Sequence, residues 1–455
     1  MYQLVRTDTI CAISTAPGVG AIAVIRLSGP EAISICDKLF SADVTAMASH
    51  TVKYGAMRKG GVLLDEVVVT LFKGPNSYTG EDIIEIGCHG SGFIQEQILK
   101  SLIEGGSRMA GPGEFTMRAF GNGKMDLSQA EGVADLIAAE SEAAHSLAMN
   151  QMRGGFSREI NGLRDELIHF ASLIELELDF AEEDVEFADR QDLMLLVDKI
   201  GATIKSLLDS FATGNVVKNG VPVAILGAPN RGKSTLLNAI LNEERAIVSS
   251  IAGTTRDTVE DTIALDGIQF RFIDTAGLRD TSDEIESMGI ERSWEKAREA
   301  VIVLYMVDAN TVTEEEISEL KATFDRKVEG DKKKMIVLAN KIDLLKDHGS
   351  LPPDVLAISA KEGQGIEELK SELTSLIKAG LNTTSSVITN VRHFDALTSA
   401  QTSLFEVRTG LDNSITGDFL AVDIRKALFH LGEITGEITV EDLLGNIFGR
   451  FCIGK

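Results

Sequence analysis

The chain contains little positive charge for its length. Of its 455 residues, 44 are Lys or Arg and 69 are Asp or Glu, which gives a formal net charge of −25 at pH 7. A protein that binds nucleic acid through its overall field needs an excess of basic side chains to neutralise phosphates. The composition excludes that class of protein, so any contact with nucleic acid requires a local basic patch or a basic partner.

Cysteine and long apolar runs are also scarce. The four cysteines, Cys11, Cys36, Cys88 and Cys452, have no spacing typical of a metal site, so we expect a reduced, cytoplasmic chain. The first residues, MYQLVRTDTI, predict no secretory signal, and no apolar run is long enough to span a membrane. With 44% apolar and 25% charged residues, the composition is that of a soluble globular protein, and the length allows roughly two to four domains.

Residues 1 to about 120 predict α+β structure. Apolar runs predict strands at 21–29, 62–72 and 81–90, and helical periodicity predicts a helix at 93–106 that ends at Gly-Gly. The Gly-Val-Gly at 18–20 precedes a strand rather than a helix, which favours a tight turn over a dinucleotide-binding fingerprint.

Two charged residues interrupt apolar strand faces in this region. Arg26 shares a face with Ile22 and Val24, and Glu85 shares one with Ile83. A charge on such a face is costly unless it is paired or binds something. Two interpretations stay open at this point. Either the two residues pair or lie at an exposed sheet edge, or they bind a ligand.

Helical patterns begin near Met125 and continue, without proline, to about Phe211. Asp126-Leu-Ser-Gln129 resembles a capping box that opens the first helix. The acidic run 175–186 is interpreted as a solvated helix end or loop, with a metal or catalytic carboxylate cluster as the weaker alternative. The short polar stretch 214–220 predicts a linker.

The region from 221 to about 379 alternates strands and helices. Its apolar runs end in polar motifs, as expected of parallel strands that are covered on both faces. Functional residues of such a sheet gather at the C-terminal ends of the strands. The runs that follow the first strand are 270–277, 300–309, 335–343 and 355–363.

Helical patterns return after a polar break at 382–386 and continue from Val391 to the end. Because helical stretches flank the α/β unit, we expect an α/β domain inserted into one discontinuous helical domain. The predicted fold class is therefore multidomain, with an α+β domain, an all-helical domain and an α/β domain. The expected boundaries are 1–120 for the N-terminal domain, 121–217 and 381–455 for the helical domain, and 218–380 for the inserted domain.

One stretch has the clearest chemistry. After a predicted strand at 221–226, residues 227–234 have the pattern Gly-x-x-x-x-Gly-Lys-Ser, and a helix pattern starts at Thr235. Strand, glycine-rich loop and helix in this order are the context of a phosphate-binding P-loop. The alternative is a tight strand-to-helix turn that contains Gly-Lys-Ser by chance.

The residue types in this loop suit phosphate. Backbone N–H groups must surround the anion, so side chains are absent at Gly227 and Gly232. The N-terminus of the following helix also favours an anion. Lys233 is expected to reach the β- and γ-phosphates, and the Ser234 hydroxyl is expected to bind Mg²⁺.

Four further motifs follow in the order of a GTPase. Asp274-Thr-Ala-Gly277 offers a carboxylate near Mg²⁺ and a small residue near the γ-phosphate, and Gly253-Thr-Thr-Arg-Asp257 offers hydroxyls from a loop that closes over the metal. Asn340-Lys-Ile-Asp343 predicts base recognition, because the Asp343 carboxylate can accept from both N1–H and the 2-amino group of guanine. Ser359-Ala-Lys361 supports the base from the next strand. Together they predict specificity for guanine.

One position departs from Ras-like GTPases. Leu278 stands where those proteins have the glutamine that orients water. The candidates that replace it are Glu284 or Glu286 farther along the switch, together with a bound cation. The Asn230 amide is a candidate ligand for a monovalent cation, with a local turn hydrogen bond as the alternative. Arg231 and Arg256 are each equally a candidate arginine finger and a surface residue.

The central motifs resemble the translation-factor-related GTPases that include Era and Der. The flanking segments PNSYTGEDIIEIGCHG, PGEFTMRAFGNGKMDLSQAEGVADLI and LGEITGEITVEDLLGNIFGRFCIGK resemble the MnmE family, also called TrmE, of tRNA-modification GTPases. The resemblance covers essentially the whole chain, and the terminal Cys-Ile-Gly-Lys is the hallmark of the family.

This resemblance implies an N-terminal domain that binds folate and dimerises, a discontinuous helical domain and an inserted G domain. It implies a homodimer and an α2β2 complex with the FAD-dependent protein MnmG, which also uses NADH. The complex places an aminomethyl or carboxymethylaminomethyl group on C5 of the wobble uridine of certain tRNAs. A tetrahydrofolate derivative supplies the one-carbon unit, and the basic residues that contact tRNA would belong mostly to the partner.

By position, the resemblance implies a folate site made of Arg26, Glu85, Lys124 and the terminal Lys455. A carboxylate such as Glu85 suits the amide and amino group of a pterin, and the basic residues suit carboxylates or carbonyls. Cys452 lies beside this terminus. It is either a participant in the modification chemistry or a buried small residue.

The resemblance also assigns residues of the G domain. Asn230 and the backbone carbonyls of Ser249, Ile251 and Thr254 are the implied potassium ligands, with potassium in the place of an arginine finger. Ser234 and Thr255 are the implied Mg²⁺ ligands, and Glu286 orients the attacking water through a second water. The residues expected to contact GTP are Asn230, Arg231, Gly232, Lys233, Ser234, Thr235, Ser249, Ser250, Ile251, Ala252, Gly253, Thr254, Thr255, Asp274, Thr275, Ala276, Gly277, Asn340, Lys341, Asp343, Ser359, Ala360 and Lys361.

Two other functions agree less well with the sequence than a potassium-dependent tRNA-modification GTPase does. A ribosome-assembly GTPase related to Era or Der is disfavoured because the sequence has neither a second G domain nor an evident GxxG RNA-binding module. An independent folate enzyme in the N-terminal region is disfavoured because Lys455, at the opposite end of the chain, belongs to the same implied site.

Overall fold

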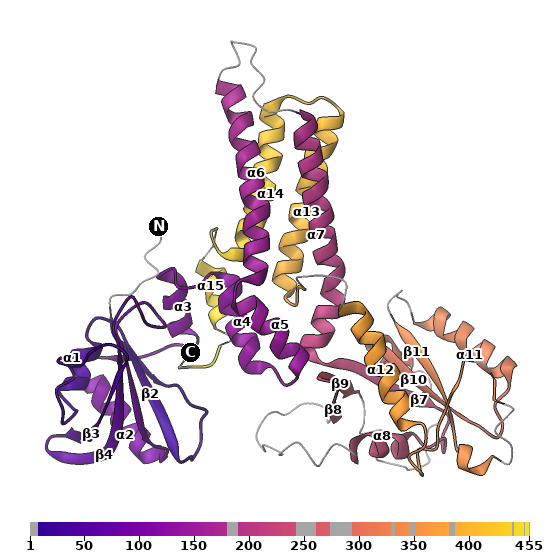
Figure 1. The fold of residues 1–455 in the computed structure, drawn as a ribbon, viewed down its shortest axis with the longest axis horizontal. Helices are drawn as coiled ribbons and strands as arrows, with labels where there is room; N and C mark the ends of the chain where they lie inside the picture. The colour runs from indigo at the N-terminus through magenta and orange to yellow at the C-terminus, as the bar shows by residue number, and fades with distance from the viewer. Residues whose placement is uncertain are drawn as a thin grey trace. The chain divides into compact units, whose positions relative to one another are not determined.

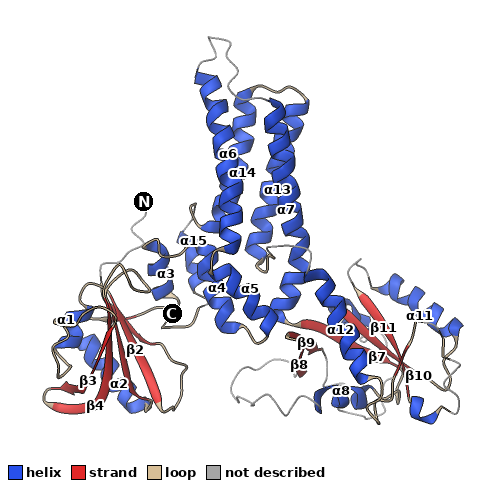
Figure 2. Cartoon of the chain, in the orientation of Figure 1, coloured by secondary structure: helices blue, strands red, loops and turns tan. Residues whose placement is uncertain are grey.

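The computed structural model describes residues 8–179, 190–242, 261–273, 294–328, 333–345, 351–352, 354–381, 387–438, 441–449 and 451–454. The chain forms two compact units, which Figures 1 and 2 show as ribbons. The first contains Met1–Ile137, Met149–Ile200 and Ala396–Lys455, and the second contains Ala138–Ala148 and Gly201–Asp395.

A six-stranded sheet forms the N-terminal part of the first unit. Every neighbouring pair is antiparallel except β1 and β6, which are parallel. Helix α2 (Gly92–Glu104) packs on one face together with α1 (Ala32–Asp37), over a core that includes Ile25, Leu27 and Val69. The strand order is β3 (Thr51–Lys59), β4 (Val62–Phe72), β5 (Ile83–His89), β2 (Ile22–Ser28), β1 (Ile10–Ile13) and β6 (Arg108–Met109).

Helix α3 (Glu114–Gly121) is tied to this sheet by a buried ion network. The Arg118 side chain is only 1% exposed, and its guanidinium lies 2.8 Å from Asp8 and 3.2 Å from both Glu81 and Glu114. An arginine removed from water in this way needs several carboxylates around it. The network fixes α3, which also places Phe115 in a small cluster with Ile10 and Ala12.

Helices from both ends of the sequence pack together in the first unit. Helix α6 packs along α14, and the ion pair between Glu175 and Arg425 joins them at 2.6 Å. Asp198 of α7 and Arg408 of α13 pair at 3.0 Å. These contacts bring together segments that the α/β insertion separates in sequence. The helices of this unit are α4 (Leu127–Ala138, except its last residue), α6 (Gly155–Asp179), α14 (Gly417–Thr435) and α15 (Glu441–Phe448). Three further helices, α5 (Glu142–Met152), α7 (Arg190–Asn219) and α13 (Val391–Asp412), have residues in both units.

The second unit contains a mostly parallel six-stranded sheet. Its strands alternate side chains between two cores, with Val223 and Ile225 on one face and Ala224 and Leu226 on the other. Helices α8 (Lys233–Asn242) and α12 (Ile366–Leu381) cover the first face, and α11 (Glu314–Lys327) covers the second. The order is β12 (Leu356–Ala357), β11 (Lys334–Asn340), β10 (Ile302–Asp308), β7 (Val221–Gly227), β9 (Ile268–Phe272) and β8 (Asp261–Leu265), with β8 antiparallel.

The predicted fold class is confirmed, whereas the predicted linker at 214–220 is wrong. Helix α7 continues to Asn219, and Gly214 lies inside it. A side chain at Gly214 would come within 2.3 Å of the Ile388 carbonyl oxygen, so this glycine permits close packing rather than a helix end. Among the described residues, no helix has both the length and the apolar character needed to cross a bilayer.

Candidate functional site

The phosphate loop connects β7 to α8 and has the backbone that its glycines predict. Gly227 and Gly232 have φ values of 140° and 95°, which are strained for any residue with a Cβ atom. An added Cβ would lie 2.5 Å from the Met306 carbonyl oxygen at Gly227, and 2.4 Å from Asn340 Nδ2 at Gly232. The loop therefore approaches its neighbours so closely that only glycine fits at both positions.

The charged residues of the loop have defined partners. Lys233 Nζ donates to the carbonyl oxygens of Gly227 and Ala228, at 2.8 and 3.0 Å, and its burial lowers the pKa of this ammonium group. Arg231 Nη1 lies 3.1 Å from Asp308 Oδ2. Asn230 is exposed, has a φ of 61° and makes no side-chain hydrogen bond within the described part of the chain. The turn hydrogen bond considered for Asn230 is therefore not observed there.

The base-reading residues meet at the ends of β11 and β12. Asn340 Nδ2 donates to the Arg231 carbonyl oxygen at 2.8 Å, and Asn340 Oδ1 accepts from Ala360 N at 2.9 Å. The Ser359 hydroxyl donates to Asp343 Oδ1 at 2.6 Å, which orients this carboxylate. Lys341 Nζ pairs with Asp308 at 2.9 Å, and the exposed Lys361 lies 3.4 Å from Glu362. Ser234 and Thr235 occupy the first turn of α8.

The predicted switch residues lie outside the described residues. The same is true of Arg256, Glu284, Leu278 and the terminal Lys455, so their expected positions stay predictions. The switch residues are Ser249, Ser250, Ile251, Ala252, Gly253, Thr254, Thr255, Asp274, Thr275, Ala276, Gly277 and Glu286.

Arg26 and Glu85 meet on the face of the N-terminal sheet opposite α2. They are directly opposite each other on β2 and β5, and Arg26 Nε and Nη2 donate to Glu85 Oε1 at 2.9 and 2.7 Å. The guanidinium also lies 5.5 Å from the ring centroid of Tyr78 and 5.6 Å from that of Phe115, within cation–π range. Within the described part of the chain, Glu85 Oε2 and Arg26 Nη1 make no hydrogen bond. Arg26 and Glu85 therefore pair with each other, and the Glu85 Oε2 acceptor and the Arg26 Nη1 donor stay available for a ligand.

The C-terminal tail lies against the same domain. Gly454 has a φ of 98°, and a Cβ there would come within 2.1 Å of the Ile13 carbonyl oxygen. The Ser14 hydroxyl donates to the Gly454 carbonyl oxygen at 3.1 Å, and Gly113 N donates to the Cys452 carbonyl oxygen at 3.3 Å. The exposed Cys452 is thus held beside the start of α3, which carries Phe115. Its interpretation as a buried small residue is wrong.

Lys124 reaches the same region from another side. Its ammonium donates to the Pro75 carbonyl oxygen at 2.9 Å, and Pro75 begins the loop that continues to Tyr78. The structure thus brings Arg26 and Glu85 together directly, and connects Lys124 to them through the loop 75–78.

Comparisons with known proteins match the chain from end to end. A family model described as "MnmE helical domain" matches residues 127–452, and one described as "GTP-binding protein TrmE N-terminus" matches residues 9–124. The protein "tRNA modification GTPase MnmE" of Flavobacterium johnsoniae is 52% identical over 99% of this chain and 100% of its own length. The chain belongs to the MnmE family. The protein of the same name from Cytophaga hutchinsonii is 53% identical, over 99% of this chain and 98% of its own.

A solved G domain of FeoB from Methanococcus jannaschii also matches, over 35% of this chain and 98% of its own length. It is 24% identical with a TM-score of 0.25, and we draw no conclusion from it.

Three residues of this MnmE family member were missed by the sequence analysis. Asp308 ends a strand that was predicted only as apolar, and its partners became visible once β10 was placed between β7 and β11. Tyr78 and Phe115 lie in two of the segments that resemble the family, but nothing in their spacing indicates that they flank Arg26. Long-range strand pairing and helix packing determine these contacts, so no local signal identifies them.

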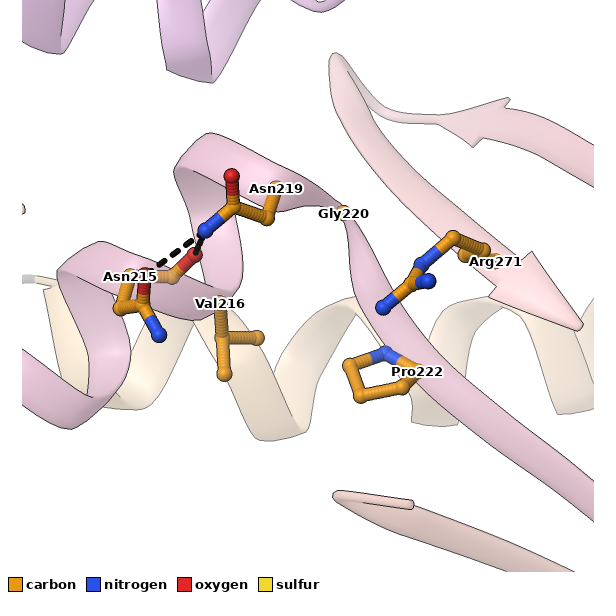
Figure 3. A pocket seen from close by; sticks show the side chains of 6 residues that line it. All are labelled: Asn215, Val216, Asn219, Gly220, Pro222 and Arg271. Atoms are coloured by element: carbon orange, nitrogen blue, oxygen red, sulfur yellow. Dashed lines mark hydrogen bonds between the residues drawn. The ribbon is translucent and has the colours of Figure 1, made fainter. Parts of the chain in front are cut away.

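A hollow of about 490 Å³ lies beside the start of β7 (Figure 3). It is at the opposite end of this strand from the phosphate loop, so we assign it no part in nucleotide binding. Asn219 Nδ2 donates to the side chain and the main chain of Asn215 at its edge, at 2.7 and 3.1 Å. The lining residues are Asn215, Val216, Asn219, Gly220, Pro222 and Arg271.

Proposed function

We propose that this chain is a GTP hydrolase that acts in tRNA modification. With an FAD-dependent MnmG partner, it forms the carboxymethylaminomethyl or aminomethyl group at C5 of wobble uridine (U34) in certain tRNAs, with a one-carbon unit from a tetrahydrofolate derivative. The observation that supports this proposal most is the end-to-end match to relatives named tRNA modification GTPases. A homodimer that joins MnmG suits the net charge of −25, because a basic partner would supply most of the tRNA contacts.

We propose that the nucleotide site binds GTP together with Mg²⁺ and K⁺. The two closely packed glycines give the loop the bare backbone that a phosphate site requires, and the Ser359 hydroxyl donates to the Asp343 carboxylate that is proposed to read the base. Ser234 and Thr255 are the proposed Mg²⁺ ligands. Asn230 and the carbonyls of Ser249, Ile251 and Thr254 are the proposed K⁺ ligands, and Glu286 is proposed to orient water. When bound, K⁺ would supply the positive charge that an arginine finger supplies elsewhere.

The contacts of Arg231 support the proposal that K⁺, and not an arginine of this loop, supplies the positive charge. Its guanidinium is paired with Asp308 at 3.1 Å, so this arginine neutralises a neighbouring carboxylate and is not assigned as a finger. A cation at Asn230 would therefore have to come from solution.

Hydrolysis in different salts tests the nucleotide half of the proposal. We expect GTP to be hydrolysed faster in KCl than in NaCl at equal ionic strength, and Asn230→Ala to abolish the difference. Asn238→Ala, an exposed amide on α8, is the matched control and should keep the potassium response. Equal rates in the two salts for the unmodified protein would refute the potassium assignment, and no hydrolysis of GTP in either salt would refute the GTPase.

The N-terminal site fits a reduced folate. Glu85 Oε2 is available to accept from the amide and amino group of a pterin, and the half-buried Tyr78 offers aromatic surface next to Arg26, while the buried Phe115 packs against the guanidinium from below the surface. Lys124 and Lys455 are proposed to meet carboxylates of the same ligand. Cys452 is proposed to take part in the modification chemistry near this site.

Calorimetry with 5-formyl-tetrahydrofolate tests this site. Arg26→Ala or Glu85→Ala should weaken folate binding by about tenfold or more, because the removed partner contributes a charge-assisted hydrogen bond. GTP affinity should stay unchanged, since these residues belong to the first unit and the phosphate loop to the second. Unchanged folate affinity in both variants would contradict the proposed site and would mean that the Arg26–Glu85 pair only stabilises the sheet.

A further inference from the structure

Asp308 lies between the two loops that the nucleotide must bridge. It ends β10, whose neighbours are β7, which leads to the phosphate loop, and β11, which leads to the base-reading loop. In register, Asp308 is opposite Asn340 on β11, and Met306 is opposite Gly227 on β7. The three strands are parallel, so their ends meet at one edge of the sheet.

The Asp308 carboxylate is shared between both loops. Oδ2 accepts from Lys341 Nζ at 2.9 Å and lies 3.1 Å from Arg231 Nη1, while Oδ1 accepts from Asn310 N and Nδ2 at 3.1 and 3.0 Å. The side chain is 13% exposed. Burial acts to raise the pKa of Asp308, but the hydrogen bonds from Lys341 and Asn310 outweigh it and lower the pKa to about 2. The group is therefore a fixed negative charge at neutral pH.

A backbone contact runs parallel to this ion network. Asn340 Nδ2 donates to the Arg231 carbonyl oxygen at 2.8 Å, and the missing side chain of Gly232 allows the approach. Arg231 is thus attached to the base-reading loop twice, by its carbonyl through Asn340 and by its guanidinium through Asp308. Two attachments restrict both the distance between the loops and the rotation of the phosphate loop.

We propose that Asp308 is a positioning residue for guanine nucleotides, which sets the spacing of the phosphate loop and the base-reading loop through Arg231 and Lys341. Asp308 does not touch the nucleotide in this account. Its role rests on the proposed guanine-nucleotide binding and extends it to a residue that contacts only other protein groups. Loops ordered before binding cost less conformational entropy when the ligand arrives, which strengthens affinity mainly through slower dissociation.

The test is the dissociation rate of mant-GDP, measured by stopped-flow fluorescence with excess unlabelled GDP on the full-length protein. Asp308→Asn keeps the size of the side chain and removes its charge, and dissociation should become about tenfold faster. Arg231→Ala should accelerate dissociation about threefold, and Arg231→Lys, which keeps the positive charge, should bring the rate most of the way back to that of the unmodified protein. The double variant Asp308→Asn with Arg231→Ala should be no faster than Asp308→Asn alone, because both changes break one network.

Two controls separate positioning from general stability. Lys321, on α11, forms an exposed ion pair with Asp354. Lys321→Ala removes this pair and should leave the dissociation rate of mant-GDP unchanged. In steady-state hydrolysis, Asp308→Asn should raise KM and leave kcat within about twofold, since bound GTP still meets the intact catalytic groups. A lower thermal midpoint for Asp308→Asn with unchanged KM and unchanged dissociation would overturn the proposal, as would additive effects in the double variant.

Nucleotide binding by the unmodified protein shows whether a failure concerns the positioning role of Asp308 or guanine-nucleotide binding itself. Tight binding of mant-GDP by the unmodified protein, combined with unaltered dissociation in Asp308→Asn, would refute the positioning role alone. Equal affinity of the unmodified protein for mant-GDP and mant-ADP would refute guanine specificity itself.

Discussion

Individual glycines make the nucleotide site possible. At Gly232, a left-handed φ of 95° and the 2.4 Å approach of Asn340 Nδ2 both exclude a side chain. The sequence predicted this glycine from the need of phosphate for bare backbone N–H groups. The structure adds a second reason, which is the hydrogen bond from Asn340 to the preceding carbonyl.

We therefore predict that Gly232→Ala abolishes measurable GTP binding and lowers the free energy of unfolding by about 1–3 kcal/mol through backbone strain. Calorimetry with GDP and urea denaturation measure the two effects. Gly162→Ala is the matched control, because Gly162 is an exposed position of helix α6 where an alanine side chain would meet nothing within 4 Å. Full nucleotide affinity in Gly232→Ala would contradict the loop geometry.

The buried thiols give the chain a defined response to alkaline pH. Burial, aided by the Asp37 carboxylate, raises the pKa of Cys36 from 9.0 to about 12. Between these values the unfolded chain loses the proton and the folded chain keeps it. The free energy of unfolding therefore falls as pH rises, by about 1.4 kcal/mol per pH unit for this thiol.

We predict that Cys36→Ala makes stability less sensitive to alkaline pH. Between about pH 8 and about pH 10, the unmodified protein should lose about 1.4 kcal/mol more than Cys36→Ala in urea denaturation. The comparison uses the change with pH, so the lower absolute stability expected from a shortened core side chain does not affect it. Parallel pH profiles for the two proteins would contradict the assignment.

Among the helices and strands, the sequence predicted those whose formation depends on neighbouring residues in the chain. The capping box is confirmed, because Gln129 N donates to Asp126 Oδ1 at 2.8 Å and Asp126 N donates to Gln129 Oε1 at 3.0 Å. The central parallel strands are confirmed as well, because apolar runs covered on both faces are distinctive. The predicted helix at 93–106 corresponds to α2.

The sequence did not predict the elements that depend on contacts with residues far away in the chain. Strand β3 buries only Met57, so its pattern has no clear alternation, and β1 and β6 are too short to show one. Gly214 indicated a helix end, but its closeness to Ile388 is a tertiary contact that no local pattern reveals. In the candidate site, the motif residues were predictable, whereas Asp308, Tyr78 and Phe115 required the strand order and the position of α3.

The C-terminal tail is an element whose position depends on one glycine. Gly454→Ala would place a Cβ 2.1 Å from the Ile13 carbonyl oxygen, so we predict that the tail leaves β1. Hydrogen–deuterium exchange of the peptide 449–455 should become faster in this variant. Gly445→Ala, an open position on α15, is the control and should leave exchange of the tail unchanged. Unaltered exchange in Gly454→Ala would mean that the tail is held by other contacts.

At the scale of the whole molecule, the α/β unit is inserted between helical segments, so that one chain carries the nucleotide site and the proposed one-carbon site. Helix α7 ends at Asn219, and the chain returns beside the same helix, where Ile388 N donates to Ser210 Oγ at 3.2 Å. Helices α6 and α14 then pack together although the G domain separates them in sequence. A nucleotide site and a proposed one-carbon site are thereby part of one chain, which is the arrangement expected when GTP hydrolysis controls a modification reaction.

The central claim is that this chain acts in the modification of wobble uridine, and mass spectrometry of tRNA nucleosides tests it most directly. In a strain that lacks the protein, we predict that the C5 aminomethyl-type modifications of U34 disappear. The unmodified gene should restore them, and the Gly232→Ala variant, which lacks the nucleotide site, should not. Normal wobble uridine modification in the strain without the protein would contradict the account.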